Sequence, residues 1–220
     1  HGQLDDDGTY DVLEGYGEGD VLRPLRSLGQ LNDALPWLAS AFPTHRSFAQ
    51  THLAGILGGR VAQASRAEVR WLASVLLLNR GDRFEVLPLP DVAQLAPVFG
   101  LGVADFNGDG HEDVLLVQNF FGEQFGAVRQ DGGRETLLLG DGKGGFREGA
   151  LRRPENDLPG EGRGVAVGDL DGDGRVDAVA SQHRGPLRWL RFENKSTGLR
   201  LRLRGDEGNP MAVGAQLRWQ

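Results

Sequence analysis

The sequence contains no cysteine, so no disulfide bond can hold the fold together, and packing or bound ions must supply the stability. It also has no long apolar run. Because a helix needs roughly 20 consecutive apolar residues to cross a membrane, we expect no membrane span. Basic residues are outnumbered, with 24 Lys and Arg against 31 Asp and Glu, and the net charge is −7. We therefore expect no nucleic-acid partner, because such a partner requires a basic face.

Common catalytic signatures are missing as well. The sequence has neither a Gly-x-Ser-x-Gly nucleophile motif nor the His-Glu-x-x-His motif of zinc proteases. The five histidines are scattered, and no pair of them has a spacing that strongly indicates a zinc site. The sequence therefore does not indicate a hydrolase of either of these two classes.

Glycine is abundant by contrast, with 34 residues against 10 proline residues. The glycines follow no strict period, and they separate short apolar runs of strand length. This composition is typical of an all-β protein with many turns. At 220 residues the chain is long enough for one domain or for two small ones.

A nine-residue pattern of oxygen-bearing side chains occurs three times in the chain. Ligand positions alternate, glycine stands at the sixth position, and an acid closes the pattern at the ninth. Calcium takes six to eight oxygen ligands, and the glycine permits the sharp turn that gathers them. The predicted ligands are Gln3, Asp5, Asp7, Thr9 and Asp11 in the first copy, Asp105, Asn107, Asp109, His111 and Asp113 in the second, and Asp169, Asp171, Asp173, Arg175 and Asp177 in the third.

The three copies are not equal. The seventh residue would contribute its backbone carbonyl, so His111 and Arg175 can be ligands whatever their side chains, and we expect the Arg175 side chain to point to solvent. The first copy begins with Gln3 where the others begin with Asp. The sequence therefore predicts two well-formed Ca²⁺ sites and a third, weaker one. The alternative is that these Asp- and Gly-rich segments are only turns.

These loops, together with Phe99-Gly100 before the second copy, resemble the FG-GAP repeats, also called VCBS repeats, of integrin-type β-propellers. In that family each repeat is one propeller blade, and calcium is held in the loop between the first two strands of the blade. The C-terminal stretch, from Asn194-Lys195 through the strand-like segments 199–203 and 212–218, resembles the start of the ASPIC/UnbV module that follows such repeats. Since the chain begins within the first loop pattern, we expect it to be a fragment of a larger secreted bacterial protein.

The resemblance and the hydrophobic patterns divide the chain into four segments. We expect a partial first blade at 1–25, a helical insertion at 26–66, two FG-GAP-type repeats at 67–198, and the start of the ASPIC/UnbV-like strand module at 199–220. Apolar residues at helical spacing predict two helices in the insertion. The expected fold is then all-β: a partial or open β-propeller of about three blades with a helical-hairpin insertion.

The resemblance implies a calcium-binding β-propeller repeat module that serves as an interaction scaffold for a protein or carbohydrate ligand. Loops that are weakly preorganised need calcium well above cytosolic levels, so we expect an extracytoplasmic location. An assembly of three blades leaves strand edges open, and we expect these edges to favour homo-oligomers.

The alternative function is a metal-dependent hydrolase of phosphate or carboxylate esters. His183 follows Gln182 at the end of a predicted strand, where the preceding repeat has Asn119 after Gln118. A metal bound on that propeller face could activate a water molecule with His183 as general base. Hydrogen bonds from the two glutamines to neighbouring strand ends are the simpler explanation of the shared pattern.

Overall fold

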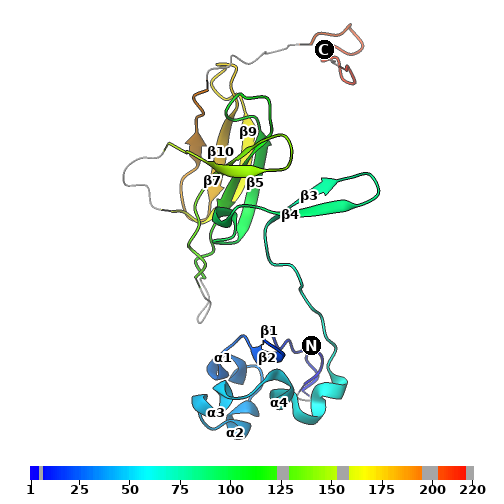
Figure 1. Ribbon diagram of the computed structural model, residues 1–220, viewed down its shortest axis with the longest axis vertical. Helices are drawn as coiled ribbons and strands as arrows, with labels where there is room; N and C mark the ends of the chain where they lie inside the picture. Colours follow the sequence, from blue (N-terminus) through cyan, green and yellow to red (C-terminus); the bar gives the residue numbers. More distant parts are fainter. Residues whose placement is uncertain (5–6, 123–128, 153–158, 195–202, 217–220) are drawn as a thin grey trace. The chain divides into compact units, whose positions relative to one another are not determined.

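The computed structural model divides into two compact units, His1–Leu72 and Ala73–Gln220, and each is described by itself (Figure 1). Strand residues outnumber helical residues, which confirms that the fold is mainly β. No helix in the described part of the chain is both long and apolar enough to cross a membrane. The described residues are 1–4, 7–122, 129–152, 159–194 and 203–216.

The first unit combines one β-hairpin with five short helical segments. The hairpin turns at Gly19, whose positive φ of 60° suits glycine. Four short α-helices stand where the sequence predicts two longer ones. The elements are β1 (Gly15–Glu18), β2 (Val21–Pro24), α1 (Leu28–Asn32), α2 (Leu38–Ala41), α3 (His45–Ala49), α4 (Leu53–Leu57) and the 3-10 helix η1 (Gly58–Gln63).

Proline explains two of the three breaks between these helices. Pro36 lies between α1 and α2, and Pro43 lies between α2 and α3. Neither can lie inside a helix, because proline lacks the N–H donor and clashes with the preceding turn. Side-chain caps then start the helices: Ser27 and Thr44 each accept a hydrogen bond from the N–H three residues later, and the His52 ring does the same for α4.

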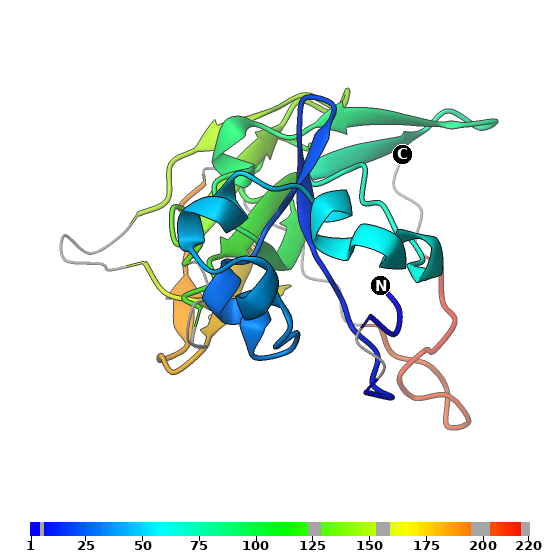
Figure 2. The same cartoon turned by 90° about the horizontal axis from the view of Figure 1, so that it is seen from below.

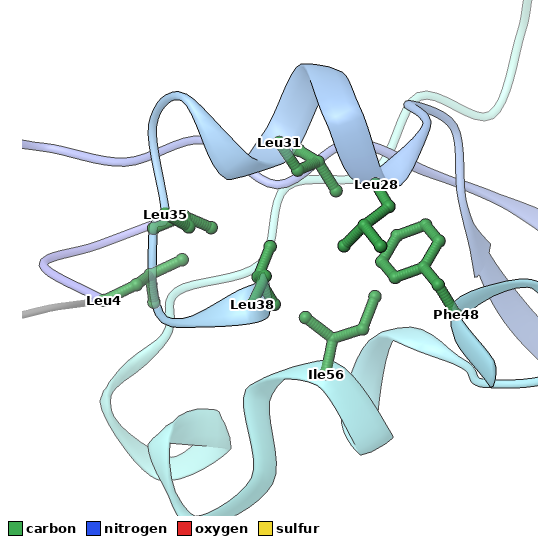
Figure 3. Packing of buried hydrophobic residues seen from close by; sticks show 7 residues of the cluster. All are labelled: Leu4, Leu28, Leu31, Leu35, Leu38, Phe48 and Ile56. Atoms are coloured by element: carbon green, nitrogen blue, oxygen red, sulfur yellow. The ribbon is translucent and has the colours of Figure 1, made fainter. Parts of the chain in front are cut away.

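Seven buried side chains form the core of the first unit (Figure 3). Six come from the helices and their connections, and the seventh comes from the first acid-rich loop. They are Leu4, Leu28, Leu31, Leu35, Leu38, Phe48 and Ile56. The segments predicted as a partial blade and as a helical insertion therefore share one hydrophobic core.

The second unit contains three antiparallel sheets, and none of them closes on itself within the described residues. A hairpin of β3 and β4 forms a separate two-stranded ribbon (Figures 1 and 2). The other sheets have the orders β5-β6-β7-β8 and β11-β10-β9. The elements are β3 (Val75–Asn79), β4 (Phe84–Pro88), the 3-10 helix η2 (Asp91–Ala93), β5 (Val98–Ala104), β6 (Asp113–Gln118), β7 (Thr136–Gly140), β8 (Phe146–Gly149), β9 (Gly162–Gly168), β10 (Asp177–Gln182) and β11 (Arg188–Leu190).

The two larger sheets begin with the same strand pair, displaced along the chain. Ala104 pairs with Asp113 in the four-stranded sheet, and Gly168 pairs with Asp177 in the three-stranded sheet, so the displacement is 168 − 104 = 177 − 113 = 64 residues. Both ladders also shift register at the far end of the strand pair, where each contains an irregularity of the β-bulge kind. The repeat predicted from the loops therefore extends to the strand pairing.

The two larger sheets pack face to face, with β5 against β9. A Cβ added at Gly102 would lie 2.7 Å from Cγ1 of Val167 and 2.8 Å from Cγ1 of Val165, which is closer than real Cβ contacts allow. Glycine is therefore needed where the sheets approach most closely. The space between the sheets is filled by one buried cluster of four side chains, namely Phe106, Leu115, Leu137 and Ala178.

The predicted C-terminal module is described only in part. Residues 203–216 form turns and irregular backbone, without a strand among them. The rest of that module, 199–202 and 217–220, lies outside the described residues. The strand character predicted for it has therefore no counterpart in the part that the structure describes.

Candidate metal centre

Two of the three acid-rich loops join the first two strands of a sheet. The second loop connects β5 to β6, and the third connects β9 to β10. In all three loops the glycine at the sixth position has a positive φ, which is 87° at Gly8, 87° at Gly110 and 84° at Gly174. Residues with a Cβ rarely adopt this conformation. The same turn is therefore built three times, and it requires glycine at this position.

The third loop gathers three carboxylates. Oxygen atoms of Asp169, Asp171 and Asp173 lie within 4.8 Å of one another, and all three residues are exposed. Backbone groups orient all three, because Gly172 N donates to Asp169 Oδ1 at 2.7 Å, Asp173 N donates to Asp171 Oδ1 at 3.2 Å, and Arg175 N donates to Asp173 Oδ1 at 2.9 Å. This set of hard oxygen donors around a sharp turn fits a hard divalent cation such as Ca²⁺.

Two arginines contact the same acids. Arg175 Nη1 donates to Asp173 Oδ2 at 3.1 Å, and Arg191 Nη2 lies 3.3 Å from Asp171 Oδ2. The sequence predicted that Arg175 points to solvent, but its side chain is half-buried and folds back on the loop. Three neighbouring carboxylates attract the nearest positive charge, which explains the difference. A cation that binds here must compete with the two guanidinium groups.

The second loop has two carboxylates and one amide at the same positions. Asp105 accepts hydrogen bonds on both oxygens from the N–H groups of the two loop glycines, at 2.7 and 2.9 Å. The Asn107 side chain donates to Asp109 Oδ2 at 2.8 Å. This bond and a second one from the His111 N–H lower the pKa of Asp109 below its ordinary value. The second loop therefore has the same frame as the third, with one acid fewer.

The closing acid of each loop is buried. Asp11, Asp113 and Asp177 are 8%, 0% and 3% exposed, and in each loop Oδ2 accepts a hydrogen bond from the N–H of the second residue, at 2.9, 3.0 and 3.3 Å. Asp113 also accepts from Asn107 N at 3.2 Å and from Gly140 N at 2.9 Å. These bonds tie the two ends of the loop together. Asp177 is not among the three gathered carboxylates, and the predicted ligand role of the closing acids stays a prediction.

The first loop repeats the frame only in part. As in the other two loops, the N–H of its seventh residue donates to the fifth-position carboxylate, here from Thr9 to Asp7 Oδ1 at 2.7 Å. The Thr9 hydroxyl donates to the same oxygen at 2.7 Å. Gln3 is exposed, and Asp5 lies outside the described residues. A weaker third site therefore stays a prediction.

His183 lies at the opposite end of β10 from the third loop. The loop leads into Asp177, the first residue of the strand, whereas His183 follows Gln182, the last residue. Six residues of strand span roughly 20 Å. His183 is exposed, and its backbone N–H donates to Glu161 O at 2.8 Å. The structure therefore does not bring the predicted general base to the gathered acids.

The glutamines at these strand ends make structural hydrogen bonds. Gln118 is buried, and its Nε2 donates to the carbonyl oxygens of Val92 and Ala96, both at 3.3 Å. Gln182 Nε2 donates to Pro186 O at 2.8 Å. Both side chains hold neighbouring connections against the strand ends, which agrees with the simpler explanation of the shared pattern.

Asn119 is a buried residue whose role the sequence did not reveal. Its φ is 90°, and its amide Nδ2 donates to Gly133 O and Gly160 O at 2.9 Å each. Its Oδ1 accepts from Gly133 N at 2.9 Å. The side chain thus links three segments of the chain. The one local signal is that Asn tolerates the left-handed conformation better than most residues.

Glu161 is the second buried polar residue at this end of the sheets. Its Oε1 accepts from Phe121 N at 3.0 Å and lies 2.6 Å from Arg163 Nη2. The Phe121 N–H, and after it the Arg163 guanidinium, hold the pKa of Glu161 below its usual value. The charged form is therefore the one that the fold accommodates.

Comparison of the chain with models of known protein families gives no match, and a search among curated proteins gives none either. The resemblance to FG-GAP repeats and to the ASPIC/UnbV module therefore stays a prediction. Function has to be inferred from the geometry of the loops.

Proposed function

We propose that the chain is a calcium-binding repeat protein in which the second and third loops each hold one Ca²⁺ ion. The observation that supports this most directly is the gathering of Asp169, Asp171 and Asp173 within 4.8 Å on a glycine-dependent turn. The second loop has the same turn and the same N–H to carboxylate bonds. Backbone carbonyls at the seventh position, together with the closing acids, would complete the coordination.

The ion would stabilise the strand pair that each loop connects. Without a cation the gathered carboxylates repel one another, and among the described basic side chains Arg175 and Arg191 relieve this repulsion in the third loop. An ion that binds the folded loop and not the unfolded chain adds about 2.7 kcal/mol of stability when its concentration is 100 times the Kd. Calcium would thus take the role that disulfides have in other extracellular proteins.

The wider role that we propose is an extracytoplasmic interaction scaffold, built as a partial or open β-propeller. Two sheets of equal register that pack face to face support this architecture, because propeller blades are antiparallel sheets of this kind. An extracytoplasmic location supplies the calcium that exposed, weakly preorganised loops require. The ligand of the scaffold would be a protein or a carbohydrate.

The hydrolase alternative receives no comparable support. His183 and the gathered acids lie at opposite ends of β10. In addition, Gln118 and Gln182 are engaged in hydrogen bonds to neighbouring backbone. A general base must reach its water molecule within hydrogen-bond distance, and this arrangement does not provide that reach.

Titration calorimetry with Ca²⁺, after removal of metal ions, tests the proposal. We expect two binding sites in the chain and weaker binding at one of them in the Asp173→Asn variant, whose third loop then carries two carboxylates and one amide, as the second loop does. The matched control is Asp141→Asn. Asp141 lies in the turn between β7 and β8, where its Oδ1 also accepts two backbone hydrogen bonds, both at 2.8 Å, but it belongs to no gathered group in the described residues.

The outcome separates the loops from ordinary acidic turns. The control should bind as the unmodified chain does. If the unmodified chain binds no calcium, or if Asp173→Asn binds calcium as tightly at every site as Asp141→Asn does, the third loop is only an Asp-rich turn and the proposal is wrong.

A further inference from the structure

The contact between the two larger sheets joins two different kinds of face. We define face A as the side of a sheet that carries Gly102 or its repeat equivalent Ala166, and face B as the side that carries Leu101 or its equivalent Val165. The displacement of 64 residues fixes these equivalences through the strand registers. Inside the second unit, face A of the four-stranded sheet packs on face B of the three-stranded sheet, because Gly102 lies against Val165 and Val167.

Face A of the three-stranded sheet has no such cover. Leu170 is 51% exposed, although its equivalent Phe106 is 1% exposed. Trp189 is 47% exposed, although Leu137, at the matching register position of β7, is 4% exposed. Positions that are alike in the repeat thus differ in burial. The Arg191 guanidinium lies over the Trp189 ring, with Cζ 4.2 Å from the ring centroid, but no sheet in the described residues of the second unit packs on this second face A.

Face B of the four-stranded sheet is open at its first strand. Leu101 is 59% exposed and Val103 is 43% exposed. The strands beside them are covered, because the segment around Ala93 packs on Leu116 and Leu138. Val167, which holds the position of Val103 in the packed contact, is also 43% exposed, so the open part of face B is identified by Leu101, at the position that the partly buried Val165 holds on β9.

We propose that a second copy of this chain covers face A of the three-stranded sheet with the open part of its own face B on β5. The contact would repeat the one inside each chain, so that Ala166 of one copy lies between Leu101 and Val103 of the next, as Gly102 lies between Val165 and Val167. Burial of these exposed apolar side chains drives the association. The proposal rests on the sheets alone and does not require the loops to bind an ion.

The expected contact is of the head-to-tail kind, because the two faces are different surfaces. Ala166 carries a methyl group at the place where Gly102 has none, and a Cβ at Gly102 would approach the facing valines to 2.7 Å. The sheets of two copies must therefore lie farther apart than the sheets within one chain. We expect an association that is reversible and depends on concentration.

Light scattering after size-exclusion chromatography, over a range of concentrations, measures the association of the full chain. We expect the mass to rise above the 23.8 kDa of one copy as the concentration increases. Trp189→Arg places a charge on face A, and Leu101→Arg places one on face B, so each variant alone should remain monomeric. Their equimolar mixture should form a dimer, because each variant retains the face that the other has lost. The control Leu72→Arg, at a residue that is 91% exposed and outside both faces, should associate as the unmodified chain does.

The absence of cysteine allows a second test that does not depend on charge substitutions. Under mild oxidation, a mixture of Ala166→Cys and Val103→Cys should cross-link as a mixed dimer, in higher yield than either variant with itself. Preferential cross-linking of Ala166→Cys with itself would show a symmetric contact between two A faces and would overturn the proposal. So would a chain that stays monomeric at every concentration, or a mixture of the two arginine variants that does not dimerise.

Discussion

Replacement of the buried Asp113 by Asn separates what holds a loop together from what an ion adds to it. The Asp113 carboxylate accepts three backbone hydrogen bonds, from Phe106 and Asn107 within the loop and from Gly140 at the end of β7, at 3.0, 3.2 and 2.9 Å. Asn has nearly the same shape but only one acceptor oxygen. Whichever way the amide is turned, at least one backbone N–H loses its acceptor and faces an N–H donor.

The expected loss of stability follows from these bonds. A hydrogen bond to a charged group contributes about 1.5–3 kcal/mol, and a buried donor left without a partner costs about 1–3 kcal/mol. We therefore expect Asp113→Asn to lower the free energy of unfolding by about 2–4 kcal/mol. At about 2–4 °C for each kcal/mol in a domain of this size, the melting temperature should fall by roughly 4–16 °C.

Thermal melts followed by circular dichroism, in EDTA and in excess calcium, distinguish the two roles. Asp113→Asn should melt below the unmodified chain already in EDTA, because its hydrogen bonds do not involve an ion, and also in calcium, where the variant loses a proposed ligand as well. Asp173→Asn should lower the melting temperature mainly in calcium, because its carboxylate is exposed and its hydrogen bonds from Arg175 N and Arg175 Nη1 lie at the loop surface, where they add less than the buried bonds of Asp113. If Asp113→Asn melts like the unmodified chain in EDTA, the closing acid does not hold the loop, and the reasoning from its burial and its bonds is refuted.

Two further predictions concern the opposite end of the sheets. A backbone N–H and then an arginine lower the pKa of Glu161 in the folded state, so the stabilisation that its carboxylate provides is present above the unfolded pKa and is lost as the pH falls through the folded pKa. The melting temperature of Glu161→Gln should therefore lie below that of the unmodified chain at pH 7 and approach it below about pH 4. A difference in melting temperature that does not change with pH would contradict this. Asn119→Ala should lower the free energy of unfolding, measured in urea, by about 1 kcal/mol more than Asn119→Gly does. Both variants lose the amide hydrogen bonds, but only Ala has a Cβ that is strained at a φ of 90°. Equal losses of unfolding free energy would exclude backbone strain as the cause.

The loops could be predicted from the sequence because their geometry is local. A turn that requires glycine at the sixth position, such as Gly110 or Gly174, is encoded within nine residues. The strand pair around each loop is nearly as local, since an antiparallel pair with a short connection has few possible registers. For this reason the displacement of 64 residues between the loops of the sequence recurs unchanged in the ladders.

The features that the sequence did not predict depend mostly on contacts between segments that are distant in the chain. Asn119 is defined by hydrogen bonds to backbone 14 and 41 residues away, and no local pattern distinguishes it from an ordinary turn residue. The first of the two predicted helices failed for a more local reason, because the hydrophobic period continues through Pro36 although a helix cannot. Hydrophobic spacing thus indicated which residues are buried more reliably than where each helix ends.

The second residue of each loop shows how one local motif can serve different cores. Its backbone N–H always donates to the closing acid, whereas its apolar side chain enters whatever lies beside the loop. Leu4 enters a cluster of helices, and Phe106 enters the space between two sheets, where its ring centroid lies 4.4 Å from that of Phe192. Leu170 has the same backbone bond but is half exposed. Since the loop forms without that burial, the exposure of Leu170 reflects no defect of the loop. It places Leu170 on the face A that we propose is covered by a second copy of the chain.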